Sequence, residues 1–431
     1  MKVVAFLPAK GSSNRIDSKN TALLDSKPLF LHTLEKLASI SEIDELYLDT
    51  ESDTIINLAA HVDCKILKRD PALASNKTDG NQLLLNEISQ VEADIYLQVL
   101  CTSPFIDADK IRQTINTLKA SPDYDSAVMV ERRKQYLWDK ERPVYDQDNI
   151  PNSNDLPDTV IETMGFYAIR REAALKLQRR VGESVLQVDA SPIEAVDVNY
   201  PEDFALANLI AAGQHEQERS IFKNLTNHLS SPILSDVLDE LNQPNQVIQG
   251  LNISLPEMKI FGRAKTLKIK KSAPEDKYDI YQAYQMYPTI RRGDIIMVET
   301  EVPEYAYFGE LNANLAHRAG AIGAIIGGHT RDRSGVDKLH FPVSSKGYTC
   351  KDVKGKGSFE YMNKAITLEG VVVDYESLVF ADSDGIVVIP KQLEGVVLQR
   401  CQEIIQTESK ILLDINTNNG IDSILGDHGN F

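Results

Sequence analysis

Small residues and cations follow the first apolar segment of the chain. The run Pro8-Ala9-Lys10-Gly11-Ser12-Ser13-Asn14-Arg15-Ile16 is followed shortly by Lys19-Asn20. Small side chains let backbone amides come close to a triphosphate, and Lys10, Arg15 and Lys19 can neutralise the charge that builds up on a departing pyrophosphate. An ordinary surface loop with a few cations explains the same residues, and the turn taken by itself favours that simpler interpretation.

A second group of charged residues lies in the C-terminal half. Gly309-Glu310-Leu311 begin a predicted helix, and Arg331-Asp332 follow Gly327-Gly328-His329-Thr330 at the end of a predicted strand. One helix and one strand between Glu310 and Arg331 can bring the chain back to the same site. The planar fork of Arg331 suits a small carboxylate, and Asp332 suits Mg²⁺ or Mn²⁺. A glycine-rich turn with an exposed Arg–Asp pair fits equally well, and His329 is more typically a packed residue than an acid or base.

The N-terminal half alternates between strand and helix patterns, which predict the elements that position the first group. The predicted strands cover residues 3–8, 45–49, 94–99, 126–130 and 164–169, and the predicted helices cover residues 28–38, 54–60, 79–90, 107–119 and 201–212. Such alternation is typical of a mostly parallel α/β sheet covered on both faces, with ligands beyond the carboxyl ends of the strands. Residues 146–158, rich in Asn, Asp and Pro, are expected to form a loop.

The pattern changes after a polar stretch at residues 215–231, which we expect to be a linker or a linking helix. Beyond it we predict helices over residues 233–241, 309–319 and 392–412, strands over residues 265–269, 294–298 and 324–326, and short strands between residues 341 and 389. We therefore predict two α/β domains, at residues 1–225 and 226–431.

Charge and cysteine content narrow the classes of partner and compartment. The 431 residues carry a net charge of −17, and both halves are acidic, so neither offers the broad basic face that nucleic-acid binding requires. No segment approaches the roughly 18 consecutive apolar residues of a membrane span, and the apolar N-terminus is interpreted as a strand instead of a signal peptide. Four dispersed cysteines predict reduced thiols in a cytoplasmic protein: Cys64, Cys101, Cys350 and Cys401.

Five segments of the N-terminal half occur in a characteristic order. They are the Pro8–Asn20 turn, Arg69-Asp70-Pro71-Ala72-Leu73-Ala74, Leu97-Gln98-Val99-Leu100-Cys101-Thr102-Ser103-Pro104, Glu162-Thr163-Met164-Gly165-Phe166-Tyr167 and Asp197-Val198-Asn199-Tyr200-Pro201-Glu202-Asp203. Together they resemble the cytidylyltransferases that activate sialic acids and 3-deoxy-manno-octulosonate. Lys10 stands where that family usually has Arg, and Asn199 replaces the second Asp of its end motif. The resemblance implies a Rossmann-like nucleotidyltransferase sheet.

The resemblance also implies roles for individual residues. The anomeric hydroxyl of an acidic 2-keto-3-deoxy sugar would attack the α-phosphorus of CTP, with Lys10, Arg15 and Lys19 acting on the departing pyrophosphate. Asp197 would bind Mg²⁺ (or Mn²⁺), although a loop or helix-capping acid is the common alternative. Likewise, Gln98 could be a core amide and Arg69 part of a surface ion pair. The implied nucleotide-binding residues are Ala9, Gly11, Ser12, Ser13, Asn20 and Arg69, and the implied sugar-binding residues are Gln98, Thr102, Ser103 and Glu162.

Residues 230–395 carry a second set of ordered segments. These are Glu310, Arg331-Asp332, Phe341-Pro342-Val343, Lys354-Gly355-Lys356-Gly357 and Asp382-Ser383-Asp384-Gly385-Ile386-Val387. They resemble the RraA-like family, an α/β fold that includes class II pyruvate aldolases acting on 4-hydroxy-2-oxo acids. The resemblance implies that Asp332 carries Mg²⁺ or Mn²⁺, that Arg331 holds the carboxylate of a pyruvate-like acid, and that Gly309, Glu310 and Leu311 contact substrate. Gly335 replaces an acid that is common in the family.

The preferred hypothesis joins the two halves: one domain makes or breaks a 2-keto-3-deoxy acid, and the other activates such an acid as a CMP conjugate. One alternative is that the C-terminal domain only assembles oligomers or regulates a partner, because some RraA-like proteins are inhibitors of a ribonuclease. Another is that the first domain uses a different nucleotide or a non-ulosonate acceptor. Both resemblances imply a homo-oligomer, as a dimer, trimer or hexamer.

Overall fold

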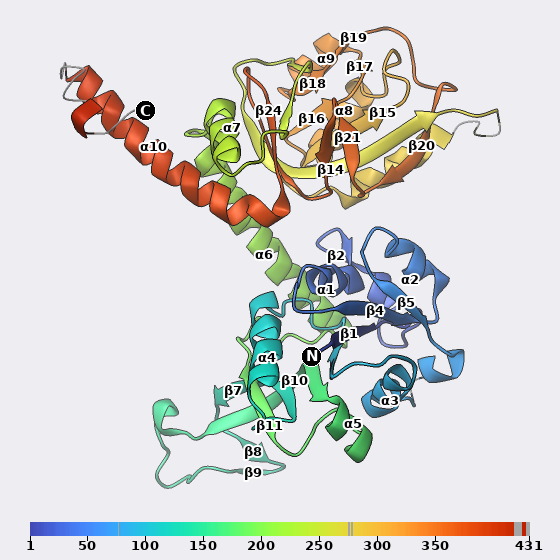
Figure 1. The fold of residues 1–431 in the computed structure, drawn as a ribbon, viewed down its shortest axis with the longest axis vertical. Coiled ribbons are helices and arrows are strands. Elements are labelled where there is room, and N and C mark those ends of the chain that lie inside the picture. Colours follow the sequence, from blue (N-terminus) through green and yellow to red (C-terminus); the bar gives the residue numbers. More distant parts are fainter. Residues whose placement is uncertain (76, 275, 277–278, 418–424, 428–431) are drawn as a thin grey trace. The chain divides into compact units, whose positions relative to one another are not determined.

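The chain folds into two compact units, Met1–Ala212 and Gly213–Phe431. The computed structural model describes residues 1–75, 77–274, 276, 279–417 and 425–427 (Figure 1). The boundary between the units, from Ala212 to Gly213, lies inside α6 (Pro201–Thr226), and residue 225, the last residue of the first predicted domain, lies in the same helix. Pro201 and two acids begin this helix, and the Ala-containing sequence after them carries no helix-breaking residue strong enough to end it at residue 212. The predicted linking stretch is therefore helical up to Thr226.

A seven-stranded sheet forms the centre of the first unit, in the order β11-β7-β10-β6-β1-β4-β5 among the described residues. All its strand pairs are parallel except those of β10, which runs antiparallel to both β6 and β7. The predicted mostly parallel α/β sheet is confirmed. Its strands are β1 (Val3–Pro8), β4 (Glu45–Thr50), β5 (Lys65–Lys68), β6 (Ile95–Val99), β7 (Ser126–Lys134), β10 (Asp158–Arg170) and β11 (Val185–Asp189).

Helices cover both faces of this sheet because side chains of β1 alternate between two apolar clusters. Val3, Ala5 and Leu7 pack with α1, α2 and α4, whereas Val4 and Phe6 pack with α3 and α5. The helices are α1 (Leu29–Ala38), α2 (Asp53–Leu58), α3 (Gly80–Gln90), α4 (Ala108–Ala120) and α5 (Arg171–Leu177). Shorter elements are η1 (Lys19–Thr21), β2 (Leu23–Leu24), β3 (Lys27–Pro28), η2 (Pro71–Ala74), β8 (Trp138–Asp139), β9 (Arg142–Pro143) and η3 (Ser153–Asp155).

The second unit is built on a nine-stranded sheet among the described residues. Its centre is a parallel run, β14-β15-β16-β18, flanked by antiparallel strands. The strands of this sheet are β12 (Val247–Ile248), β13 (Asn252–Ile253), β14 (Ile260–Lys271), β15 (Ile295–Thr300), β16 (Gly323–Ile326), β18 (Val343–Ser345), β20 (Gly357–Met362), β23 (Leu378–Ala381) and β24 (Ile386–Ile389).

Helices and a hairpin bury the two faces of this second sheet. Buried side chains of α8 and η4 pack on one face of the parallel strands, and the β21–β22 hairpin packs on the other. A further apolar cluster joins α6, α7 and α10 to β14, β23 and β24. The elements are α7 (Ser231–Glu240), η4 (Asp279–Thr289), α8 (Glu310–Ala319), β17 (His329–Thr330), α9 (Arg333–Lys338), β19 (Gly347–Tyr348), β21 (Ile366–Leu368), β22 (Val371–Val373), η5 (Lys391–Leu393) and α10 (Glu394–Asn416).

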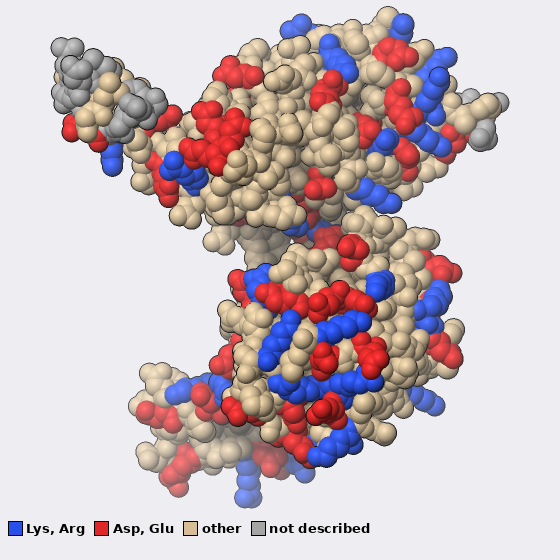
Figure 2. Space-filling view, in the orientation of Figure 1, with Lys and Arg blue, Asp and Glu red and all other residues tan. Residues whose placement is uncertain are grey.

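Two further features bear on possible partners. In the part of the chain that the structure describes, no helix combines the length and the apolar character needed to cross a bilayer. Acidic and basic side chains are interspersed over the face of the molecule drawn in Figure 2. All four cysteines are free thiols, in agreement with the prediction of reduced cysteines.

Candidate functional site

A cavity of about 520 Å³ lies at the carboxyl ends of β1, β5 and β6. The ladder β6-β1-β4-β5 is parallel, and open α/β sheets place ligands beyond the carboxyl ends of such strands. Of the residues predicted for the first site, seven line this cavity: Lys10, Ser13, Arg15, Lys19, Asn20, Arg69 and Thr102. The structure thus brings together segments that are up to 92 residues apart in the sequence.

The cationic side chains of the turn converge on this cavity from different depths. Lys19 is 8% exposed, and its Nζ donates a hydrogen bond of 2.8 Å to the carbonyl of Val198. Burial lowers the pKa of Lys19. The guanidinium of Arg15 is exposed and lies 5.1 Å from the centre of the Tyr200 ring. Lys19 and Arg15 can therefore act on different oxygens of a polyanion, Lys19 from a buried position and Arg15 from an exposed one.

Hydrogen bonds fix the path of the turn itself. The Asn20 amide donates to the carbonyl of Lys10 at 2.8 Å, and the Ala9 amide continues the ladder by donating to the carbonyl of Asp49 at 2.9 Å. The Gly11 amide donates to the Glu51 carboxylate at 2.6 Å. The Gly11 amide, which was predicted to face phosphate, therefore donates its hydrogen bond to a carboxylate of the protein instead. Ser12 is exposed, and it lies outside the residues that line the cavity, as do Ala9 and Gly11.

Arg69 is held by a buried carboxylate beneath the cavity. Its Nε and Nη2 donate to the two carboxylate oxygens of Asp49 at 2.9 and 2.7 Å, and Nη2 also donates to the Asp49 carbonyl at 2.9 Å. Arg69 is 3% exposed and Asp49 is 0% exposed, so this is an internal ion pair and not the surface pair considered from the sequence. This bidentate pair fixes the orientation of the guanidinium plane in the cavity lining.

A second buried acid, Glu87 of α3, extends this network. It accepts a hydrogen bond of 2.9 Å from the Gln98 amide. Burial, and after it the charge of Asp49, raises the pKa of Glu87. Gln98 is 1% exposed and lies outside the cavity lining, in the position of the core amide that the sequence allowed.

The other predicted sugar-binding residues are dispersed. Thr102 lines the cavity, whereas Ser103 is fully buried and its Oγ has no hydrogen-bond partner among the described residues. Glu162 is exposed on β10 and accepts a hydrogen bond from the hydroxyl of Tyr167. Only Thr102 of this predicted set therefore faces the same cavity as the cations.

Asp197 lies beside the cationic turn, close enough for its charge to raise the pKa of Lys19 against the larger effect of burial. Its Oδ2 accepts a hydrogen bond from the Asn199 amide, and its buried Oδ1 has no hydrogen-bond partner in the described chain. No three His, Cys, Asp or Glu residues of the described chain gather into a metal-binding group. One carboxylate with an unpaired oxygen fits a magnesium ion that takes its other ligands from phosphates and water.

The second predicted site lies at a cavity of about 260 Å³ in the second unit, at the carboxyl ends of the parallel strands. Gly309, Leu311, Arg331 and Asp332 of the predicted set line it. Arg331 lies between two carboxylates, with Nη1 3.3 Å from Asp352 and Nε 3.6 Å from Asp332. Asp332 has a left-handed backbone (φ 58°), and its Oδ2 accepts from the Glu310 amide at 3.2 Å. These exposed carboxylates suit a hard divalent cation that keeps several waters.

Two glycines make room for these acidic side chains. A Cβ on Gly309 would lie 2.6 Å from Asp332 Oδ2, and a Cβ on Gly335 would lie 2.4 Å from the carboxyl carbon of Glu310. The glycine that replaces a common acid of the family thus leaves space for Glu310, which does not line the cavity. His329 is packed, with both its backbone amide and its Nδ1 2.8 Å from the carbonyl of Pro303.

Sequence reasoning missed four acids that shape these sites. Asp49 lies near the end of β4 and Glu51 directly follows that strand, so both could have been noticed as acids at its carboxyl end. Glu87 has no such signal, because it reads as a polar position of an amphipathic helix. Asp352 lies 20 residues after Asp332 on a separate loop and becomes a partner of Arg331 only through the fold.

Comparisons with known proteins agree with both resemblances. Residues 4–181 match a family model described as Cytidylyltransferase, and residues 231–388 match one described as Aldolase/RraA. The chain is 25% identical over 235 residues to the 8-amino-3,8-dideoxy-manno-octulosonate cytidylyltransferase of Shewanella baltica, covering 47% of this chain and 96% of that protein. It is 21% identical over 241 residues to the N-acylneuraminate cytidylyltransferase of Escherichia coli, covering 53% of this chain but only 57% of that protein.

The C-terminal part has a separate relative. The chain is 29% identical over 172 residues to a putative 4-hydroxy-4-methyl-2-oxoglutarate aldolase of Halalkalibacterium halodurans, covering 39% of this chain and 77% of that protein. The two resemblances stated from the sequence are confirmed, each for its own part of the chain.

Proposed function

We propose that the first unit transfers CMP from CTP to the anomeric hydroxyl of an acidic 2-keto-3-deoxy sugar and releases pyrophosphate. The observation that carries the proposal is the convergence of Lys10, Arg15 and Lys19 on one cavity at the carboxyl ends of parallel strands. The cytidylyltransferase match over residues 4–181 supports the nucleotide class. The ulosonate acceptor is inferred from the names of the relatives in Shewanella and Escherichia.

The residues of this unit would act mainly by position and charge. Lys19, held by the Val198 carbonyl, presents a desolvated ammonium to the phosphates, and Arg15 adds a second cation at the entrance. Arg69, fixed on Asp49, would present its guanidinium edge to the cytosine base. Asp197 would hold Mg²⁺ through its unpaired oxygen. The ion, when bound, would supply Lewis-acid stabilisation of the phosphates.

Pyrophosphate release tests this proposal. The full chain is incubated with CTP, Mg²⁺ and a panel of eight- and nine-carbon ulosonates and shorter ulosarates. We expect Lys19→Gln to lower kcat by about 10² or more, because it removes a charge that acts on the leaving group. Lys176→Gln is the matched control, since Lys176 is exposed on α5 outside the cavity. Absence of pyrophosphate release with every acceptor in the panel would contradict the proposal.

For the second unit we propose metal-dependent aldol chemistry on a 4-hydroxy-2-oxo acid. Arg331 would hold the substrate carboxylate, and Asp332 would hold Mg²⁺ or Mn²⁺. The family match over residues 231–388 supports this class. We expect pyruvate release from such acids with added metal, and its loss in Asp332→Ala.

An oligomerisation or regulatory binding module is the alternative for this unit. The ion pair of Arg331 with Asp352 favours it, because it engages the cation that would bind substrate. Two results together would establish the alternative. The wild type would release no pyruvate above background, and analytical ultracentrifugation would show an oligomer that Asp332→Ala leaves intact. We further propose that the protein is a homo-oligomer and that it is cytoplasmic. The same sedimentation experiment measures the number of subunits in the oligomer.

A further inference from the structure

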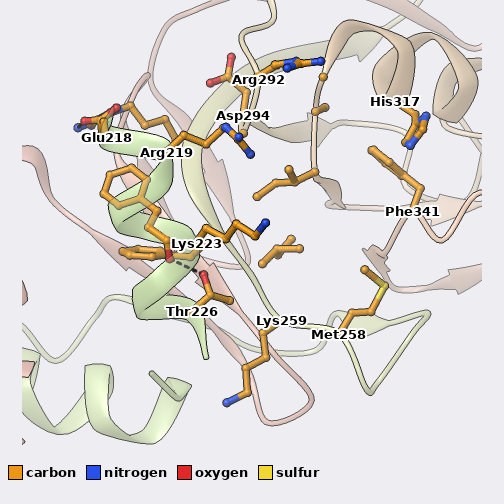
Figure 3. A pocket seen from close by; sticks show the side chains of 18 of the residues that line it. Glu218, Arg219, Lys223, Thr226, Met258, Lys259, Arg292, Asp294, His317 and Phe341 are labelled. Carbon is orange, nitrogen blue, oxygen red and sulfur yellow. Dashed lines mark hydrogen bonds and ion pairs between the residues drawn. The ribbon is translucent and has the colours of Figure 1, made fainter. Parts of the chain in front are cut away.

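The second unit contains another cavity, of about 550 Å³, which neither proposed activity uses. It is lined by the second half of α6 and by the segments that directly precede β14, β15, β16 and β18 (Figure 3). It therefore lies at the amino ends of the parallel strands, whereas Arg331 and Asp332 lie at their carboxyl ends. The two cavities are at opposite ends of one sheet.

The lining of this cavity is locally basic in an acidic chain. It contains five Lys or Arg side chains and two carboxylates, although the whole chain carries a net charge of −17. Three histidines add further positive character when protonated. The basic residues are Arg219, Lys223, Lys259, Arg263 and Arg292, and the acids are Glu218 and Asp294.

The acids of the lining are already engaged, but some of the cations are not. Glu218 pairs with Arg263 (Nε to Oε1 3.1 Å), and Asp294 accepts from the Arg291 amide at 2.8 Å. Within the described residues, no carboxylate lies within ion-pair distance of Lys223 or Arg292. Figure 3 shows the Lys223 side chain reaching from α6 into the cavity. A ligand that supplied an anionic group would neutralise Lys223 without displacing an existing ion pair.

The rest of the lining is apolar and partly aromatic. Phe222 of α6 packs on Phe261 of β14 with ring centres 4.8 Å apart, and Phe341, Met258 and Ile322 complete the apolar surface. The three Phe side chains are at most 7% exposed, so the apolar surface open to a ligand comes mainly from Met258 and Ile322, and a simple inorganic anion would leave it in contact with water. An apolar or planar body joined to the anionic group would cover it, at roughly 25 cal/mol per Å² of apolar area removed from water.

Several contacts hold these walls in place without a ligand. Arg263 links α6 to α10, because its Nη1 lies 3.0 Å from Glu394 Oε1 while its Nε contacts Glu218. The turn before β15 is fixed by a hydrogen bond of 2.9 Å from the Gly293 amide to the Gly320 carbonyl, and both glycines have a left-handed backbone (φ 96° and 104°). Preformed cavities of this size are typical of small-molecule sites.

We propose that this cavity is a binding site for a small organic anion, in which a phosphate or carboxylate group on an apolar or planar body pairs with Lys223. Arg292 adds a further cation to the lining, and Met258 and Ile322 offer apolar surface to the body. The site is independent of the CMP-transfer and aldol proposals, because it shares no lining residue with either of their cavities.

Fluorescence titration of the full chain with anilinonaphthalene sulfonate tests the proposal, because this probe joins an anionic group to a planar apolar body. We expect saturable binding of the probe. Lys223→Glu should weaken its affinity by about fivefold or more at low salt, whereas Lys223→Arg, which keeps the positive charge, should retain it. Ile322→Trp should abolish it by filling the cavity. Lys338→Glu is the matched control, since Lys338 is an exposed lysine of α9 outside the lining.

Competition then identifies the head group. Displacement of the probe by phenyl phosphate or by phenylacetate, but not by benzyl alcohol, supports the site and shows which anion it prefers. The proposal is wrong if Lys223→Glu and Ile322→Trp, both folded by circular dichroism, bind the probe as the wild type does. It is equally wrong if benzyl alcohol displaces the probe as well as the two anions do, since Lys223 would then have no role.

Discussion

The buried pair of Arg69 and Asp49 makes a substitution of Arg69 a test of stability as well as of nucleotide choice. The proposed contact between Arg69 and the cytosine base suggests Arg69→Ala as a probe of cytosine recognition. In the structure the guanidinium makes three hydrogen bonds to Asp49, two to its carboxylate and one to its carbonyl. Removing it would leave a fully buried carboxylate without its cation. A loss of CTP activity in this variant alone would therefore be ambiguous.

The cost of this unpaired charge can be estimated from the burial of both partners. Breaking a buried ion pair by removing one member costs about 3–5 kcal/mol, because the remaining charge is desolvated and unpaired. This is a large part of the roughly 5–15 kcal/mol that stabilises a typical domain. Replacing both partners by uncharged residues is often close to neutral. We therefore expect Arg69→Met to destabilise strongly, and Arg69→Met with Asp49→Asn to recover most of the loss.

A double-mutant cycle on chemical denaturation, followed by circular dichroism, measures this difference. We expect a coupling energy of about 2 kcal/mol or more between the two substitutions, well above the few tenths seen for independent sites. The double variant, once shown to be folded, is then assayed with CTP and with UTP. A selective loss with CTP would assign cytosine recognition to Arg69. A single Arg69→Met variant that loses less than about 1 kcal/mol would refute the reasoning from burial.

Glu87 offers a check on the same network through pH. Burial raises its pKa in the folded state above the ordinary value of 4.5, so the folded protein keeps a proton that the unfolded chain releases. Stability must then fall as pH rises above about 4.5, by at most about 1.4 kcal/mol per pH unit. Glu87→Gln removes this dependence while keeping a neutral group of the same shape. The measurement is the difference in free energy of unfolding between the wild type and Glu87→Gln. If this difference stays constant between pH 5 and pH 7, Glu87 is not protonated in the folded protein.

Three further predictions concern single residues. Gly309→Ala should lower Mn²⁺ affinity by about tenfold or more, measured by calorimetry, because its Cβ would lie 2.6 Å from Asp332 Oδ2. Burial raises the pKa of Cys101 to about 11, so at pH 8 iodoacetamide should label the exposed Cys350 and leave Cys101 unmodified, as peptide mass spectrometry would show. Burial lowers the pKa of Lys36 from 10.5 to about 8, so the folded state loses this proton at a lower pH than the unfolded chain does. As the pH rises from about 8 to 10.5, the free energy of unfolding of the wild type should therefore increase relative to that of Lys36→Met, measured by chemical denaturation.

Much of the fold could be predicted from the sequence because its strands and caps are locally encoded. The Asp79 cap of α3 makes the reciprocal hydrogen bonds of a capping box with Gln82, and the Asp107 side chain caps α4 by accepting from the Asp109 amide. β5 and β11 were missed, because Lys65–Lys68 and Val185–Asp189 are short and only partly apolar. Their pairing with β4 and β7 comes from the sheet that they extend, which is a tertiary effect.

The candidate sites divide in the same way. Lys10, Arg15 and Lys19 could be predicted because they stand in one short turn whose composition is itself informative. Their relation to Arg69 and Thr102 required the parallel order of β1, β5 and β6. Contacts of the Gly11 amide with Glu51 could not be predicted, because they depend on where the loop after β4 places one carboxylate.

The cavity lined by Lys223, Arg292 and Phe341 shows why sequence motifs reveal sites at the carboxyl ends of parallel strands more readily than sites at their amino ends. Loops at the carboxyl ends of parallel strands carry contiguous motifs, since each strand delivers a few residues that face one ligand. At the amino ends the lining comes instead from single residues on many segments, such as Lys223 of α6, Arg292 before β15 and Phe341 before β18. Such a set leaves no pattern in the sequence, and only the excess of basic residues and the apolar surface of the lining identify it.

A ligand bound there would contact α8 near His317, while the first residues of the same helix lie beside Asp332. One helix of ten residues therefore contributes lining residues to both cavities of the second unit.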